Sequence, residues 1–163
     1  MTLDQLVARE QIRDALSRYA RGVDRLDLDL ALSAFHPGAV DHHGKNVGDP
    51  RTIFPLIFDR LRSHVADSHF LGCSVIEFRS ALEACAETPA IGFHRIRTDS
   101  GLTDLRIGLR YVDRFEERDG TWAITHRHVL EDWRRADIVD DCAPGAFEQG
   151  RRDRSDRSYL FLG

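Results

Sequence analysis

The sequence predicts an α+β protein in which three helices come first and a long antiparallel sheet follows. In most of the segment 3–63 apolar residues recur at helical spacing, and proline and glycine stand at the breaks. From residue 67 onwards the chain instead contains long runs rich in β-branched and aromatic residues, separated by short turns. Helices and strands that are segregated along the chain are typical of α+β folds, whereas alternating ones are typical of α/β folds.

The first helix is predicted over residues 3–22. Thr2 suits its N-cap, Asp4 adds a favourable negative charge to its first turn, and Gly22 is placed as its terminator. Apolar residues recur along the segment at steps of three and four, which predicts one buried stripe: Leu6, Ile12, Leu16, Tyr19 and Val23.

Two further helices are predicted before the sheet. The second covers residues 27–35, with Asp27 as its N-cap, and the third covers residues 50–63, with Pro50 at its start. Residues 39–49, between these helices, predict a short strand and a polar loop.

The sheet is predicted to be a meander of long strands. Asp119-Gly120 is a strong signal for a hairpin turn between the last two strands. The tail, residues 136–163, is arginine-rich and then ends in the apolar YLFLG, so it is either a segment that docks on a neighbouring subunit or a disordered end. The strand segments are HFLGCSVIEF, LEACAETPAIGFHRIRT, LRIGLRYVDRFEER and TWAITHRHVLEDWRR.

Length and composition predict a single domain, residues 1–163, with its core over about residues 3–135. The net charge of -4 is too small to predict a nucleic-acid-binding surface. No apolar run approaches the ~20 residues that span a membrane, and the N-terminus lacks the layout of a signal peptide. We therefore expect a cytoplasmic protein with no nucleic-acid or membrane partner. Three cysteines without CxxC spacing are expected to be reduced packing residues: Cys73, Cys85 and Cys142.

Two residues are candidates for acid–base chemistry, although each is commonplace when taken alone. Asp24 follows the predicted end of the first helix, where a carboxylate is usually a turn residue, and His69 opens a strand. The chain has eight histidines, and His126 and His128 share one strand face, but no HExxH or cysteine-rich spacing accompanies them. We therefore predict no functional metal.

Three stretches of the chain carry a resemblance to a known family. They are IRDALSRYARGVDRLDLDLALSAFHPGAVDHHG, SHFLGCSVIEF and RYVDRFEERDGTWAITHRHVLEDW. The chain resembles the SnoaL-like family of the nuclear-transport-factor-2-like superfamily over about residues 5–135. This resemblance implies a cystatin-like α+β cone or barrel, in which three N-terminal helices pack on a strongly curved, mostly antiparallel sheet.

The resemblance also implies catalysis by an Asp–His dyad. In family enzymes such as scytalone dehydratase, bile-acid 7α-dehydratase and hexachlorocyclohexane dehydrochlorinase, the His takes a proton from the substrate and the Asp orients the His. The matching residues here are Asp24 and His69, with Tyr19 and Arg127 at the positions of supporting groups. Asp41 stands where the dehydrochlorinase has a tryptophan, which implies a more polar pocket rim and argues against halide elimination.

The chemistry of these residue types agrees with that implication. A neutral His, with an ordinary pKa of about 6.5, is a usable base at neutral pH, and a carboxylate on its other nitrogen fixes the tautomer. Tyr19 can donate a hydrogen bond to a leaving hydroxyl or an oxyanion, and Arg127 can hold negative charge. None of these steps needs a cofactor.

Two further residues are candidates for the pocket wall. On the last predicted strand Trp133 has the same parity as Arg127, whereas His126 and His128 have the opposite parity and are expected on the outer face. His94 lies in mid-strand and is either a second proton carrier in the pocket or a structural residue.

These residues together predict a lyase that acts on a small hydrophobic cyclic or aromatic alcohol. The reaction is either a dehydration or a retro-aldol-type C–C cleavage such as loss of formaldehyde. Two alternatives are a ketosteroid-type isomerase, and a non-catalytic ligand-binding protein or dioxygenase small subunit. The family resemblance also implies a homo-oligomer, with a trimer favoured over a dimer.

Overall fold

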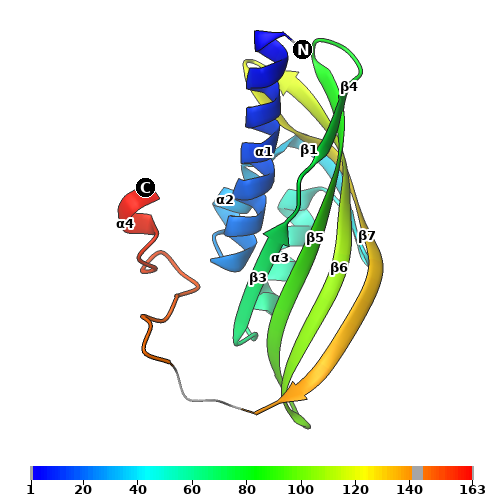
Figure 1. The fold of residues 1–163 in the computed structure, drawn as a ribbon. Coiled ribbons are helices and arrows are strands. Elements are labelled where there is room, and N and C mark those ends of the chain that lie inside the picture. The colour runs from blue at the N-terminus through cyan, green and yellow to red at the C-terminus, as the bar shows by residue number, and fades with distance from the viewer. Residues whose placement is uncertain (1, 141–144, 163) are drawn as a thin grey trace.

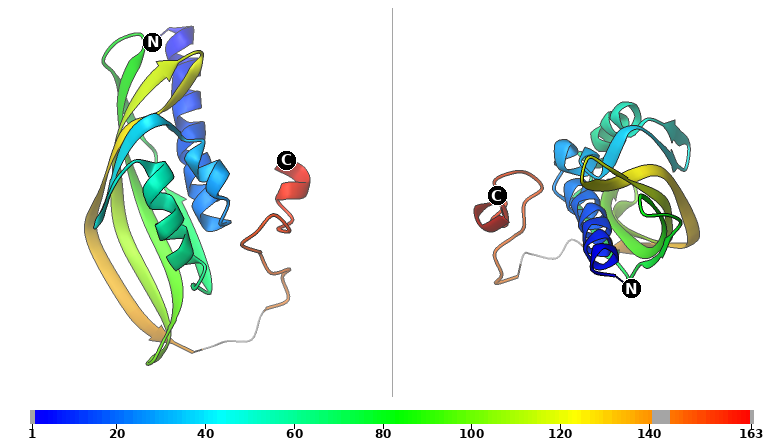
Figure 2. Two further views of the ribbon diagram at one scale, coloured as in Figure 1. Left: turned by 180° about the vertical axis from the view of Figure 1, so that it is seen from behind. Right: turned by 90° about the horizontal axis from the view of Figure 1, so that it is seen from above.

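A computed structural model, which describes residues 2–140 and 145–162, confirms the α+β class. The helices α1 (Leu3–Asp24), α2 (Leu28–Leu32) and α3 (Pro50–Leu61) lie against the concave face of one curved, unclosed sheet (Figures 1 and 2). Predicted helices and observed helices agree except at their ends: the first extends two residues further, and the second stops before Phe35, where a strand begins.

The sheet has seven strands in the order β2-β1-β7-β6-β5-β3, and β4 pairs with β5 beside this path. The pairing is antiparallel throughout, except that β1 runs parallel to β7. The long hairpins β5–β6 and β6–β7 therefore form the curved wall of the cone. The strand bounds are β1 Phe35–His43, β2 Asn46–Gly48, β3 Ala66–Leu71, β4 Val75–Phe78, β5 Glu83–Thr98, β6 Gly101–Arg118 and β7 Thr121–Val139.

Local sequence chemistry explains the helix ends. Thr2 and Gln5 form a reciprocal capping box at the start of α1, and the Asp27 carboxylate accepts the Leu30 N–H at the start of α2. Gly22 does not end α1. It lies where α2 crosses most closely, since a Cβ at this position would come within 2.4 Å of the Ala31 backbone nitrogen.

The predicted hairpin turn is present between β6 and β7. Asp119 and Gly120 have φ values of 52° and 81°, as a two-residue turn with left-handed residues requires. The turn fixes a register in which Arg118 pairs with Thr121.

Two irregularities in β7 change which side chains face the helices. The β6–β7 register shifts between Arg114 and Phe115 and again between Gly108 and Leu109, so that Thr125 and Asp132 are extra residues on β7. Each β-bulge of this kind reverses the alternation of faces beyond it. Parity counted from the sequence therefore fails at the far end of the strand.

Trp133 is the residue affected by this failure. It was predicted to share the inner face with Arg127, but it pairs with Gly108 and is 48% exposed. A Cβ on Gly108 would lie 2.1 Å from the indole Nε1, so the ring covers the glycine on the outer side of the sheet. The prediction that Trp133 lines the pocket is wrong, and the second bulge is the reason.

The described part of the tail contacts its own chain. Residues 145–162 run beside α1 and α2 and end in α4 (Tyr159–Leu162), coloured orange to red in Figures 1 and 2. The Tyr159 hydroxyl donates to Asp27 at 2.9 Å, and Arg21 stacks on the Tyr159 ring. The described residues of the tail therefore contact α1 and α2 of their own chain, and docking on a neighbouring subunit stays a prediction.

The structure also bears on the predicted packing role of the cysteines and on the expectation of no membrane-spanning helix. Cys73 is exposed and Cys85 is half-buried; both are free thiols, so a packing role is wrong for Cys73. Cys142 lies outside the described residues. Within residues 2–140 and 145–162, none of the helices has the length and apolar character needed to cross a membrane.

The close approach of α1 and α2 gives a stability prediction. Replacing glycine by alanine inside a helix ordinarily stabilises it by up to about 1 kcal/mol. Gly22→Ala should instead lower the free energy of unfolding by about 1–3 kcal/mol, because the methyl group displaces α2. Urea denaturation measures this, with Ser17→Ala on the exposed face of α1 as the control. A stabilised Gly22→Ala protein would contradict the packing described here.

Candidate active site

A cavity of about 440 Å³ lies between the helices and the concave face of the sheet. Its size suits a small organic molecule. Polar groups converge in it from β1, β3, β5 and β7, among them the imidazoles of His43, His69 and His94. Much of the wall is apolar and comes from both layers of the fold: Val23, Phe54, Phe58, Ile107, Leu109 and Val129.

Asp24 and His69 are in direct contact. Asp24 is the last residue of α1, and its Oδ1 lies 2.7 Å from His69 Nδ1. Its Oδ2 accepts the backbone N–H of the same histidine at 2.9 Å. Two hydrogen bonds from one carboxylate fix both the position of β3 and the orientation of the ring. With its proton on Nδ1, neutral His69 keeps the lone pair of Nε2 free, as a general base requires.

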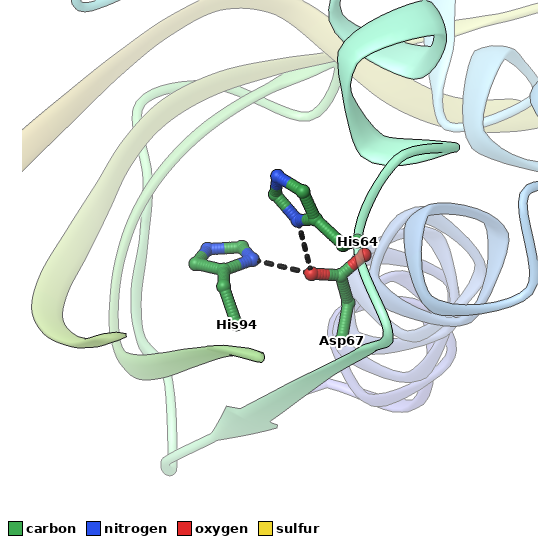
Figure 3. Close-up of side chains that lie close together, drawn as sticks. All are labelled: His64, Asp67 and His94. Carbon is green, nitrogen blue, oxygen red and sulfur yellow. Dashed lines mark hydrogen bonds and ion pairs between the residues drawn. The ribbon is translucent and has the colours of Figure 1, made fainter. Parts of the chain in front are cut away.

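His94 belongs to a second carboxylate–imidazole group. Its Nδ1 lies 2.6 Å from Asp67 Oδ1, and His64 Nδ1 lies 2.8 Å from the same oxygen (Figure 3). Asp67 is on β3, directly opposite His94 on β5. His94 also lines the cavity, so the structure places it in the pocket rather than elsewhere on the sheet.

The two imidazoles meet over a glycine. A Cβ built on Gly92 would lie 3.4 Å from His94 Nε2 and 3.6 Å from His69 Nε2. The ring centroids of the two histidines are 5.6 Å apart. Both Nε2 atoms therefore lie over the bare backbone of Gly92, on the same side of β5.

The second group also has ligands that a metal ion could use. The ligand atoms of His64, Asp67 and His94 all lie within 4.8 Å of one another. The Arg152 guanidinium forms an ion pair with Asp67 through the other carboxylate oxygen. This positive charge beside the carboxylate opposes binding of a cation there, and it suits a network of hydrogen bonds.

Electrostatics keep Asp67 ionised. Burial alone would raise the pKa of Asp67, but the hydrogen bonds from His64 and His94 and the charge of Arg152 outweigh burial. The pKa of Asp67 therefore lies well below its ordinary value. A carboxylate that is charged and almost fully buried, at 3% exposed, holds both imidazoles by their Nδ1 atoms.

Arg127 lies behind the cavity wall. It is fully buried and makes two hydrogen bonds to Asp113, at 2.8 and 2.7 Å. Its guanidinium carbon lies 4.2 Å from the centre of the Tyr19 ring and 4.4 Å from that of Tyr111. The two tyrosines line the cavity, so Arg127 supports the residues that a ligand would touch.

The hydroxyl groups of the two tyrosines stay protonated. Burial raises the pKa of Tyr19 and the pKa of Tyr111 well above the ordinary value. Among the described residues, no group hydrogen-bonds the buried Tyr111 hydroxyl. It is therefore a donor available to an oxygen atom of a ligand.

Asp41 is not at the pocket rim, where it was predicted. It is fully buried on β1, in register with Arg127 on β7. Neither carboxylate oxygen has a hydrogen-bond partner among the described residues, and the closest ion-pairing group is His43 Nδ1 at 3.6 Å. The polarity that the sequence predicted for the rim is thus found beneath the cavity.

The outer-face histidines follow the prediction. His126 and His128 are exposed, and the ring of His128 stacks on His42 with a centroid separation of 4.1 Å. They point away from the cavity because the first bulge lies before them in β7.

The sequence analysis missed several residues of this region. Asp113 could not have been placed from the hairpin alone, because that register pairs it with His126, and the extra residue Thr125 moves it opposite Arg127. Asp67 shares a strand face with His69 by parity. No local sequence pattern indicates the other three, Tyr111, His64 and Arg152, as site residues. Their roles depend on contacts that form only in the folded chain.

Comparisons with known proteins agree with this architecture. The family model of the SnoaL-like domain matches residues 4–128. No curated protein sequence matches the chain.

Several solved structures are similar in fold. A putative scytalone dehydratase from Novosphingobium aromaticivorans DSM 12444 has a TM-score of 0.74 at 18% identity, covering 91% of this chain and 100% of that chain. Hexachlorocyclohexane dehydrochlorinase LinA-type3 from Novosphingobium barchaimii LL02 has a TM-score of 0.76 at 20% identity, covering 88% and 99%. The beta subunit of a putative aromatic-ring-hydroxylating dioxygenase from N. aromaticivorans DSM 12444 has a TM-score of 0.63 at 21% identity, covering 79% and 92%.

The charge on Asp67 gives a pH-dependent stability prediction. Asp67→Asn should lower the free energy of unfolding at neutral pH by about 2–3 kcal/mol, because it removes the ionised partner of Arg152. A carboxylate with a depressed folded-state pKa stabilises fully above its unfolded pKa, so this difference should shrink as the pH falls below about 4. Denaturation by urea across this pH range measures it.

The matched control is Asp59→Asn, which removes an exposed carboxylate of α3. Exposed ion pairs contribute about 0–1 kcal/mol, so this variant should stay close to the unmodified protein at every pH. Equal stability of Asp67→Asn and the unmodified protein at neutral pH would contradict the role given to Asp67.

Proposed function

The chain belongs to the SnoaL-like domain family, and from this premise we propose that it is a cofactor-independent lyase. Its substrate is a small hydrophobic cyclic or aromatic alcohol, which loses either water or a one-carbon fragment such as formaldehyde. The proposal rests above all on one observation: two carboxylate-bound imidazoles present their Nε2 atoms to one point over Gly92, inside a largely apolar cavity.

In the dehydration, His69 is the general base. Its Nε2 takes a proton from the carbon beside the carbinol carbon, the C–H electrons form the double bond, and the C–O bond breaks. Asp24 stabilises the resulting imidazolium through Nδ1. His94, protonated at the start, gives its Nε2 proton to the departing hydroxyl, which leaves as water.

The tyrosines stabilise negative charge as it develops. Because burial keeps both hydroxyls protonated, Tyr19 and Tyr111 can donate to an oxygen of an enolate-like or phenolate-like intermediate. Arg127, stacked behind both rings, adds positive potential and holds them in place. Apolar walls exclude water, which strengthens these interactions.

The C–C cleavage variant uses the same groups. His69 takes the proton of a hydroxyl, the adjacent C–C bond breaks as the carbonyl forms, and the electron pair remains on the ring-bearing fragment. His94 then protonates that carbon. The two variants are told apart by the products, which are water and an alkene in one case and an aldehyde in the other.

Isomerisation is a second candidate function, and the tyrosine pair is the feature that favours it. Protonated buried hydroxyls suit the stabilisation of a dienolate oxygen, with His69 moving a proton between two carbons. Such a reaction leaves the mass of the substrate unchanged.

Substitution of the dyad tests the proposal. A panel of cyclic and aromatic alcohols is screened for rising ultraviolet absorbance, since elimination extends conjugation, and mass spectrometry identifies the product. His69→Ala and Asp24→Asn should each lower kcat by about 10²–10⁴-fold, because the base is lost or its tautomer is no longer fixed. His126→Ala, on the outer face, is the control and should keep full activity. Unchanged turnover in a folded His69→Ala protein would contradict the mechanism.

We also propose that the protein assembles as a homo-oligomer, with a trimer favoured over a dimer. Large apolar side chains on the sheet are exposed in the single chain and would be covered by assembly: Ile91, Leu130, Trp133 and Ile138. Sedimentation equilibrium should therefore give a mass of three chains or, failing that, two. A stable monomer at micromolar concentration would contradict this expectation.

A further inference from the structure

The tail brings a partly buried cation to the candidate site. Arg152 is 85 residues from Asp67 in sequence, yet its Nη2 donates to Asp67 Oδ2, and its side chain is 16% exposed. Its Nη1 donates to the carbonyl oxygens of Leu61 and His64, at 3.0 and 2.8 Å. Leu61 is the last residue of α3, and its carbonyl also accepts the His64 N–H at 3.0 Å, so Arg152 adds a second donor at the negative end of the helix.

The segment around Arg152 is fixed on both sides of this contact. The Arg151 N–H donates to Asp156 Oδ2 at 2.7 Å, which closes a tight local loop. Further along, the Tyr159 hydroxyl donates to Asp27 at the start of α2. Contacts on both sides of Arg152 therefore fix its backbone, and this restricts the positions that its guanidinium can reach.

We propose that Arg152 is a positioning residue for the His94 imidazole and that it acts through Asp67. The inference rests on the proposed function, in which His94 carries a proton. A carboxylate is planar, so a guanidinium fixed on Oδ2 determines the direction in which Oδ1 points. In this structure Oδ1 points to His64 Nδ1 and His94 Nδ1 at once.

Arg152 also makes the burial of Asp67 tolerable. While the two imidazoles are neutral, Arg152 is the permanently charged partner of Asp67 among the described residues. Without Arg152, we expect the Asp67 carboxylate to rotate toward water, because an uncompensated buried charge is costly. His94 then loses the acceptor that fixes its Nδ1 proton, and its Nε2 no longer stays over Gly92.

The experiment compares three full-length variants with the unmodified protein. Arg152→Gln keeps a polar N–H donor but has no charge, and Arg152→Lys restores the charge. Arg157→Gln is the matched control, because Arg157 is an exposed tail arginine bound to Glu148. Thermal unfolding monitored by circular dichroism checks that each variant is folded.

The first measurement needs no substrate. Imidazole ¹⁵N chemical shifts report the tautomer of each histidine, and His94→Gln assigns the His94 signals. The spectra are recorded at an alkaline pH at which the imidazoles are neutral, and the expected result there is a fixed Nδ1–H tautomer for His94 in the unmodified protein and in Arg157→Gln. Arg152→Gln should show a mixture of tautomers, and Arg152→Lys should shift it back. An unchanged His94 tautomer in folded Arg152→Gln overturns the proposal, whatever the activity.

The second measurement uses the substrate found in the alcohol screen. Arg152→Gln should lower kcat by about 10–100-fold with KM little changed, as is typical of residues that orient a functional group. Arg152→Lys should recover part of this loss. Unchanged kcat in folded Arg152→Gln overturns the proposal. If the tautomer changes but no alcohol is converted by any form of the protein, the positioning role stands and the lyase function fails.

Discussion

The buried ion pair between Arg127 and Asp113 is the contact around which the rest of the fold is arranged. Both side chains are fully buried, and they lie opposite each other on β7 and β6. The guanidinium also faces Tyr19 of α1 and Phe35 of β1. A buried pair of this kind adds little net stability, but it tolerates only one register of the strands around it. It therefore fixes the positions of helix and sheet relative to each other at the base of the cavity.

Most carboxylates around the cavity are paired, and the exception is informative. Asp24 and Asp67 each hold imidazoles by Nδ1, so that the Nε2 atoms face inward. Asp41 has no hydrogen-bond partner among the described residues although it is fully buried. A buried carboxylate without a hydrogen bond is costly, and such costs are characteristic of functional sites rather than of structural cores. This arrangement agrees with a site whose polarity serves a ligand.

The sequence predicts those parts of the molecule that depend on local signals. Helical spacing and capping residues predict α1–α3, and Asp119-Gly120 predicts the β6–β7 turn. Asp24 and His69 come together as the resemblance implied. The two β-bulges have no comparable signal, because each extra residue of β7 becomes visible only in its pairing with β6. The sequence therefore placed Trp133 on the wrong face of the sheet. The contact of Arg152 with Asp67 depends on the folded path of the whole chain, so no local pattern can predict it.

The short strand β3 connects the two carboxylate–imidazole groups. It is six residues long, lies at the sheet edge, and carries both Asp67 and His69 on one face. An edge strand has backbone N–H groups without sheet partners. In β3 the Asp24 carboxylate accepts the outward-facing N–H of His69. Pairing with β5 holds the strand on its other side, and Arg152 holds Asp67. Because one strand sets the position of the base and of the carboxylate that orients the acid, these anchors determine the separation of the two Nε2 atoms. The precision of the site thus depends on how well an edge strand is fastened, and less on the long strands that form the wall.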